Sequence, residues 1–161
     1  MSIPQSGGGP IEHHGQLAEY LSDGCKPKTD WRIGTEHEKF GYCDVSLKPL
    51  PFEGDRSIEA VLGALRDRHN WAEVCEGGKL TGLEKNGANV SLEPGGALEL
   101  SGAPLETIHE TCDEVNQHLR EVMDIASEMG VGFIGLGAAP TWSHVEMPLM
   151  PKGRYKLMDA Y

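Results

Sequence analysis

The sequence predicts an α+β fold in which antiparallel strands pack against amphipathic helices. Three observations lead to this fold class. Residues 89–101 form a hairpin pattern, residues 57–69 and 105–129 show the apolar stripes of helices, and 21 glycines among 161 residues indicate many turns. The length is typical of one domain, and we assign residues 1–161 to a single domain without an internal repeat or interdomain linker.

The hairpin at residues 89–101, NVSLEPGGALELS, is predicted as two strands joined by the turn residues Pro94-Gly95-Gly96. Strand side chains alternate between the two faces of a sheet, so apolar and polar residues separate onto opposite faces. The apolar face holds Val90, Leu92, Leu98 and Leu100. The polar face holds Glu93 and Glu99. The simplest interpretation of this face is a sheet surface exposed to solvent, without a function.

A second strand is predicted over residues 31–40, WRIGTEHEKF, with Glu36 and Glu38 on one face and His37 on the other. Two strands that each carry a pair of carboxylates suit hard divalent cations, which prefer oxygen ligands. If the strands face a common cavity, the four acids would bind Mg²⁺ or Mn²⁺ together with a nucleotide. The predicted metal ligands are Glu36, Glu38, Glu93 and Glu99.

The remaining elements follow from apolar periodicity and capping residues. Residues 1–10 are expected to be disordered, and residues 11–22 to form a short helix with Leu17, Tyr20 and Leu21 facing inward. Ser57 caps the helix at 57–69. Strands are expected at 71–75, after Lys79 and at 131–136, and irregular chain after Gly137.

The longest helix is expected from about Leu105 to Met129, opened by Pro104 and ended by Gly130. Its apolar residues recur in steps of three and four, which indicates one face directed at the core. Cys112 lies on this stripe and is expected to be a small, inert core residue. His118 and the other helix histidines are expected at helix surfaces or ends.

The net charge and the cysteine pattern argue against several classes of partner and cellular location. Fourteen basic against 25 acidic residues give a net charge of −11, which argues against nucleic acid or an anionic membrane as a partner. No apolar stretch approaches the ~20 residues of a membrane span, and no secretory signal opens the chain. The four cysteines are scattered, which predicts reduced thiols, a cytoplasmic location and no disulfide needed for folding.

Phosphate-binding loops and nucleophilic catalysis find little support in the sequence. The Gly77-Gly78-Lys79 stretch lacks the first glycine of a Walker loop, and residues 135–140 end in proline where the dinucleotide fingerprint needs a helix. No Ser-His-Asp or Cys-His arrangement can be argued from spacing. Any bound ATP would therefore depend on metal and on isolated basic side chains.

Three motifs carry a family resemblance. They are RIGTEHEKFGY at 32–42, SLEPGGALELSGAPLETIHET at 91–111 and MPKGRYK at 150–156. Together they resemble glutamate–cysteine ligases of the type found in plants and many proteobacteria, and the similarity runs from about residue 11 to 156. The resemblance implies a glutamine-synthetase-like catalytic fold, an antiparallel sheet with helices packed on one face and ligands on the other.

The resemblance also implies a reaction. These ligases join the γ-carboxyl of glutamate to the amine of cysteine with ATP and Mg²⁺, by way of γ-glutamyl phosphate, in the first step of glutathione synthesis. Positioning and electrostatics carry such chemistry, so no side chain is needed as nucleophile or general base. The four glutamates would line the site, and Arg154 and Tyr155 would contact a substrate carboxylate or phosphate.

Family members are more than twice as long, so we expect the chain to be the amino-terminal part of an incomplete catalytic fold. By itself it is expected to bind metal or nucleotide weakly and not to perform the ligation. Three alternatives stay open. A related carboxylate–amine ligase would use another amine, a glycoside hydrolase would use paired carboxylates, and a non-catalytic fragment would only bind metal or nucleotide. Aromatic residues, the usual sugar platforms, make up only 6%.

Overall fold

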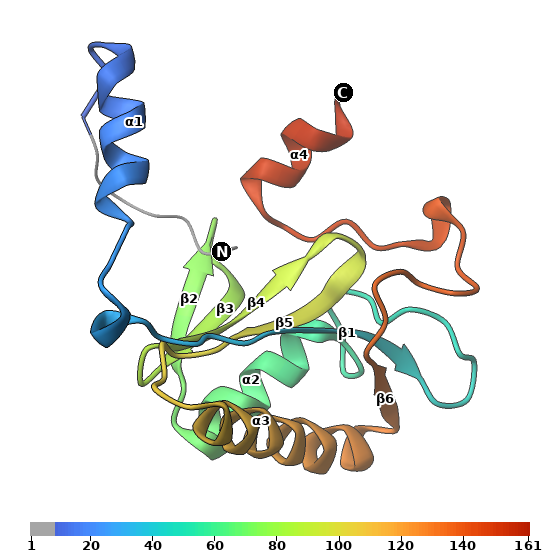
Figure 1. The fold of residues 1–161 in the computed structure, drawn as a ribbon. Coiled ribbons are helices and arrows are strands. Elements are labelled where there is room, and N and C mark those ends of the chain that lie inside the picture. Colours follow the sequence, from blue (N-terminus) through green and yellow to red (C-terminus); the bar gives the residue numbers. More distant parts are fainter. Residues whose placement is uncertain (1–8) are drawn as a thin grey trace.

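A single six-stranded sheet organises the chain, and all its neighbouring strands are antiparallel (Figure 1). The computed structural model describes residues 9–161. The strand order is β2-β3-β4-β5-β1-β6. The strands are β1 (Glu36–Cys43), β2 (Ala72–Glu76), β3 (Lys79–Lys85), β4 (Ala88–Glu93), β5 (Ala97–Ser101) and β6 (Val131–Ile134). The predicted α+β class with an antiparallel sheet is confirmed.

Two helices cover one face of this sheet, as the sequence predicts. The helices are α2 (Ile58–His69) and α3 (Ile108–Met129), which lie beneath the strands in Figure 1. The Ser57 hydroxyl caps α2 by accepting from the Ala60 backbone N–H at 3.1 Å. Apolar side chains of both helices and of the sheet form one core, which includes Val61, Leu62, Leu65, Leu83, Val90, Leu92, Leu98, Leu100, Val122 and Ile125.

The β4–β5 hairpin shows the predicted alternation. Leu92 pairs with Leu98 and Val90 with Leu100 on the core face, while Ser91 lies opposite Glu99 on the other face. The turn is a short 3-10 segment, Pro94–Gly96, in which Gly95 and Gly96 have φ values of 76° and 78°. Such positive φ angles favour glycine because it lacks a Cβ atom. The Pro-Gly-Gly turn therefore holds the register that separates the two faces.

Helix α3 begins later than predicted, and its predicted apolar stripe lies in the core only in the second half of the helix, where Val122 and Ala126 are buried. Thr107 and Glu110 form a reciprocal capping box, so the helix starts at Ile108 and not near Leu105. The side chains of Ile108 and Cys112 are exposed, which makes the predicted core position of Cys112 wrong. The buried residues are Thr111, His118, Glu121, Val122, Ile125 and Ala126, so polar groups occupy the inner face of the first turns. His118 is therefore buried, contrary to the expected surface position.

The two ends of the chain differ most from expectation. Helix α1 (His14–Asp23) projects away from the sheet (Figure 1), and none of its residues is buried, so the inward positions predicted for Leu17, Tyr20 and Leu21 are wrong. Residues 137–152 are irregular apart from the 3-10 turn η3 (His144–Glu146), but residues 153–159 form a further helix, α4 (Gly153–Asp159). The disorder predicted for residues 1–10 falls largely on residues 1–8, which lie outside the described residues.

Strand β1 begins at Glu36, five residues after the predicted start, and extends to Cys43. It pairs with β5 on one side and with β6 on the other, so it lies inside the sheet. Cys25, Cys43, Cys75 and Cys112 are all free thiols, and whether folding needs a disulfide stays a prediction. Over residues 9–161, none of the helices has the length and apolar character needed to cross a membrane.

Candidate functional site

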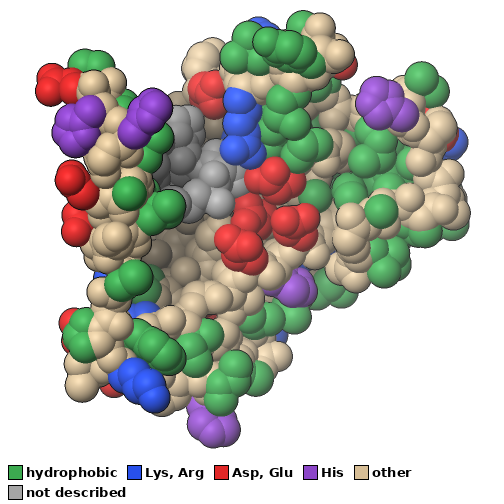
Figure 2. Space-filling view, turned by 45° about the horizontal axis from the view of Figure 1, so that its top comes forward, with side chains coloured by type: hydrophobic (Ala, Val, Ile, Leu, Met, Phe, Trp, Pro, Cys, Tyr) green, Lys and Arg blue, Asp and Glu red, His purple; other side chains and the backbone are tan. Residues whose placement is uncertain are grey.

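The four predicted glutamates lie on the sheet face away from α2 and α3. Glu38 pairs directly with Glu99 across β1 and β5, and Glu36 lies two residues along the same face, opposite Ser101. Glu93 shares the face because it lies two residues from Ser91, which pairs with Glu99. Figure 2 looks onto this face and shows acidic side chains gathered beside a basic one at its hollowed centre. We call Glu36, Glu38, Glu93 and Glu99 the acidic cluster.

Glu99 is the most enclosed member of the cluster, with only 4% of its surface exposed. The hydroxyls of Ser91 and Ser101 both donate to its carboxylate, each at 3.1 Å. Glu36 and Glu38 are exposed, and Glu93 is half-buried. The cluster therefore combines one enclosed carboxylate, Glu99, with two exposed ones, Glu36 and Glu38, that can turn toward a ligand.

Glu93 also contacts residues of the 150–156 motif. This motif covers the end of the irregular segment and the start of α4. Arg154 Nη2 lies 3.0 Å from Glu93 Oε1 and 2.8 Å from the Tyr155 hydroxyl. The buried Tyr155 hydroxyl also donates to the Leu92 carbonyl at 2.8 Å and to Glu93 at 3.2 Å. Burial raises the pKa of Tyr155 to about 12. The structure thus brings both sequence-predicted residues of this motif to the acidic cluster.

Lys152 is a site residue that the sequence reasoning missed. It is buried, and its Nζ donates to the Leu92 carbonyl at 2.8 Å. Burial and the charge of Arg154 lower the pKa of Lys152 to about 8, while the charges of Glu93, Glu76 and Glu99 act in the opposite direction. The sequence did offer one signal, since Lys152 belongs to the same motif as Arg154. A lysine between Pro151 and Gly153 is not expected to be buried for packing alone, so its place in this motif pointed to the site.

A second missed lysine lies behind the acidic cluster. Lys39 extends from β1 to the helix side of the sheet, where it is only 2% exposed. Its Nζ lies 3.4 Å from the carbonyls of His37 and Leu98 and from His37 Nδ1. Burial lowers the pKa of Lys39 to about 7, and the charge of Glu99 partly opposes that shift. His37 lies on the helix side as predicted, and burial followed by the charge of Lys39 lowers its pKa.

The acidic cluster fits Mg²⁺ or Mn²⁺ in its donor chemistry but is not a preassembled cage. Its donors are all carboxylate oxygens, which hard divalent cations prefer. Within residues 9–161, no three His, Cys, Asp or Glu side chains lie close enough to hold one ion together. Mg²⁺ usually takes one or two protein carboxylates and completes its shell with water and phosphate oxygens. The directly opposed Glu38 and Glu99 suit that mode better than a four-ligand site.

Comparison with known proteins gives a family for this arrangement. The profile described as glutamate-cysteine ligase family 2 matches residues 32–161, which include the whole sheet and the 150–156 motif. The chain is 51% identical over 145 residues to the chloroplastic glutamate–cysteine ligase of Medicago truncatula, and 50% identical to that of Brassica juncea. It is 49% identical to glutamate–cysteine ligase A, also chloroplastic, of Oryza sativa.

These matches cover 90% of this chain but only 28–29% of each relative's length. The chain therefore spans less than a third of the curated proteins that it matches. The relatives' names also correct one prediction from the sequence. The cytoplasmic location inferred from scattered cysteines is wrong in light of relatives that are named chloroplastic, because reduced thiols do not distinguish one reducing compartment from another.

The buried Lys39 predicts a specific pH dependence of stability. Its pKa falls from 10.5 in the unfolded chain to about 7 in the fold, so below pH 7 the full cost of burying an ammonium is present. Between these two values the folded chain binds fewer protons than the unfolded chain, and the cost shrinks as pH rises. Lys39→Met should therefore raise the free energy of unfolding by a few kcal/mol (~1.4 kcal/mol per pKa unit) below pH 7, with the difference from wild type falling toward pH 10.

Urea unfolding of the purified chain at several pH values measures this difference. Lys26→Met replaces an exposed lysine and is the matched control, for which we expect no such dependence. A Lys39→Met difference that stays constant from pH 6 to pH 10 would contradict the assignment.

Proposed function

Since the chain belongs to glutamate-cysteine ligase family 2 through the match over residues 32–161, we propose that it forms part of the site of an ATP- and Mg²⁺-dependent glutamate–cysteine ligase. The substrates would be glutamate, cysteine and ATP. The observation that carries the proposal is the acidic cluster joined to Arg154 on the open face of the sheet, because it combines oxygen ligands for a cation with a donor for an anion.

The proposed reaction has two steps. The γ-carboxylate of glutamate attacks the γ-phosphorus of ATP, giving γ-glutamyl phosphate and ADP. The cysteine amine then attacks the γ-carbonyl carbon, a proton leaves the nitrogen, and inorganic phosphate departs. A bound Mg²⁺ would neutralise charge on the β- and γ-phosphates. Positioning and electrostatic stabilisation suffice for both steps, so the proposal needs no nucleophile or general base from the protein.

Within this reaction the chain's own residues would have separate roles. Glu36, Glu38, Glu93 and Glu99 would together bind one or more metal ions, each ion taking one or two of the carboxylates, with Glu99 fixed by Ser91 and Ser101. Arg154 would bind a substrate carboxylate or phosphate, since its planar guanidinium suits bidentate contacts with either group. Without a ligand it is held by Glu93, so a metal that takes over Glu93 would release Arg154 toward the anion.

Tyr155 would act through its neighbours more than by contact with a substrate. Its hydroxyl is already engaged by Arg154, Glu93 and the Leu92 carbonyl, and its side chain is buried. We therefore propose that Tyr155 fixes the position of Arg154. The charges of Glu93 and Glu99 act on the pKa of Lys152. Lys152 would therefore add positive potential next to the phosphates.

The proposed activity is tested in a full-length context, with this chain joined to the remaining part of the Medicago truncatula enzyme. Purified protein is given Mg²⁺, ATP, glutamate and an equal concentration of cysteine or of another small amine such as alanine, glycine or 2-aminobutyrate. We expect γ-glutamylcysteine to be formed fastest, with equimolar ADP. Faster product formation from another amine would replace the proposal with a related carboxylate–amine ligase, and ATP hydrolysis without any product would contradict both.

The acidic cluster is tested in the same chimera by replacing Glu36 or Glu93 with Gln. Both substitutions keep the shape of the side chain but remove a charge from the metal site, so the fold should persist while Mg²⁺-dependent turnover falls roughly 100-fold or more. Glu84→Gln is the matched control, because Glu84 pairs with Asn89 on the same sheet face and lies outside the cluster. Near-normal turnover in both cluster variants would refute the assignment.

A further inference from the structure

An apolar pocket lies at the turn of the β4–β5 hairpin, next to the Glu93 end of the acidic cluster. It has a volume of about 320 Å³ and is enclosed by the turn, by residues 144–150 and by α4. Figure 2 shows hydrophobic side chains gathered next to the basic one beside the acidic side chains. We call this hollow the methionine pocket, after three residues of its lining, Met147, Met150 and Met158.

The methionines give the pocket a closed floor and an open wall. Met150 is only 1% exposed, whereas Met158 is 61% exposed, so a ligand can enter from solvent on the α4 side. Methionine side chains are unbranched and polarizable, so they adapt to the shape of a ligand and make favourable contacts with aromatic rings. The lining therefore suits a flat ring system.

Gly95 shapes the wall opposite α4. Its φ of 76° favours glycine, and a Cβ atom at this position would collide with the methyl group of Met147. Met147 consequently packs directly on the backbone of the turn. The Pro-Gly-Gly turn thus serves both the strand register and the shape of the pocket.

Two polar side chains stand at the rim of the pocket. His144 and Asp159 both line it and are exposed to solvent. An imidazole can donate a hydrogen bond to a ring nitrogen, and a carboxylate can accept one from an amino group. Apolar walls with a few polar groups that fix orientation are typical of sites for small molecules. A purine base offers the flat ring, the ring nitrogens and the amino group that such a site recognises.

Tyr155 connects the methionine pocket with the rest of the site. It lines the pocket, and its hydroxyl lies 2.8 Å from Arg154 Nη2 and 3.2 Å from Glu93 Oε2. Arg154 and Met158 are about one turn apart on α4, or ~6 Å along the helix axis. This length is comparable to the separation that a ribose places between a base and its phosphates. The phosphates of a nucleotide bound in the pocket would therefore reach Arg154 and a cation held by Glu93.

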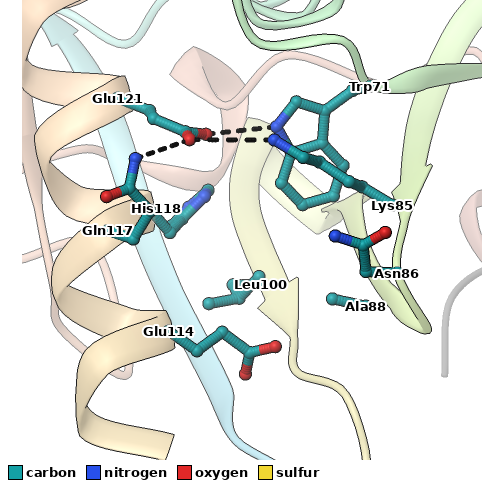
Figure 3. A pocket seen from close by; sticks show the side chains of 9 residues that line it. All are labelled: Trp71, Lys85, Asn86, Ala88, Leu100, Glu114, Gln117, His118 and Glu121. Atoms are coloured by element: carbon teal, nitrogen blue, oxygen red, sulfur yellow. Dashed lines mark hydrogen bonds and ion pairs between the residues drawn. The ribbon is translucent and has the colours of Figure 1, made fainter. Parts of the chain in front are cut away.

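The cavity on the helix side of the sheet offers less to a ligand. It has a volume of about 140 Å³, less than half that of the methionine pocket. Lys85 Nζ lies 5.5 Å from the centre of the Trp71 ring and 4.0 Å from Glu121, which also accepts from Trp71 and Gln117 (Figure 3). The lysine and Glu121 are therefore already engaged with each other and with Trp71.

We propose that the methionine pocket binds the purine base of the nucleotide co-substrate. The inference rests on the proposed function, which requires ATP next to the acidic cluster. The base packs against Met147 and Met158, its polar edge faces His144 and Asp159, and its phosphates extend toward Arg154. The side chain of cysteine fits less well, because it would fill only a small part of the pocket.

NMR of the purified 161-residue chain, labelled with ¹³C in the methionine methyl groups, tests the proposal. ATP with Mg²⁺ should move the methyl signals of Met147, Met150 and Met158 upfield and saturably, because the ring current of a base acts on nuclei above its plane. Met123 and Met129 belong to α3 and should not move. Tripolyphosphate with Mg²⁺ carries the phosphates without a base and should give no upfield shift.

A variant of the open wall tests the contribution of the pocket to affinity. Met158→Ala removes an exposed apolar side chain, so the fold should persist while ATP binding weakens about fivefold. Met123→Ala, at a residue that is 51% exposed on α3, is the matched control and should leave the affinity unchanged. In the chimera with the Medicago truncatula enzyme, Met158→Ala should raise KM for ATP and leave KM for glutamate and for cysteine unchanged.

Three results would overturn the proposal. They are the absence of upfield methyl shifts with ATP in both the chain and the chimera, an equal shift with tripolyphosphate, and a Met158→Ala effect confined to KM for cysteine. The last result would assign the pocket to the amine substrate.

Failure of this proposal and failure of the proposed function give different results. A chimera that forms γ-glutamylcysteine normally, with an unchanged KM for ATP in Met158→Ala, would reject the base site and keep the ligase. A chimera without ligase activity would reject the proposed function, while upfield methyl shifts with ATP in the purified chain would still place a base in the pocket.

Discussion

The pairing of Glu38 with Glu99 across β1 and β5 is the constraint on which the rest of the structure depends. Two carboxylates directly opposite each other in a sheet repel, because their Cβ atoms are only about 4.5–5.5 Å apart. The fold tolerates the pair because the hydroxyls of Ser91 and Ser101 donate to Glu99 and because Lys39 lies buried behind it. A cation on the open face would complete this compensation, which is why we connect the pair with metal binding.

The sheet separates two kinds of polar chemistry. On the open face, the carboxylates of the acidic cluster and Arg154 lie at the surface of the sheet. On the helix side, Lys39 and His118 are buried and His37 is half-buried, and Lys39 is held there mainly by long contacts to backbone carbonyls. Of these groups Lys39, with a pKa of about 7, carries the positive charge that lowers the repulsion among the acids without occupying the ligand face, whereas the lowered pKa of His37 favours its neutral form. The same arrangement explains why the inner face of α3 is partly polar, with Glu121 receiving hydrogen bonds from Trp71 and Gln117.

Much of this architecture could be predicted from local patterns. The period-two alternation at 89–101 placed Glu93 and Glu99 on one face, and the Ser57 cap with its apolar stripe placed α2. Local patterns could not give the β1–β5 register, which joins residues about sixty positions apart, nor the burial of Lys39 and His118 that follows from it. The inward positions predicted for the apolar residues of α1 were wrong for a related reason. An amphipathic pattern shows that one face of a helix is apolar, but it does not show which element covers that face. Arg154 and Tyr155 came from a family resemblance, and the same motif gave no reason to expect that Lys152 would be buried.

We expect a divalent cation to bind at the open face of the sheet and not at the other acidic surfaces of the chain. Mn²⁺ tests it most directly, because its unpaired electrons broaden the NMR signals of nearby nuclei, so that titration into the ¹⁵N-labelled chain locates the ion. The account predicts that the strongest broadening falls on the amides of residues 36–38 and 99, and that excess Mg²⁺ reverses it. Broadening centred on the exposed acids of α3, or spread evenly over the surface, would contradict the account.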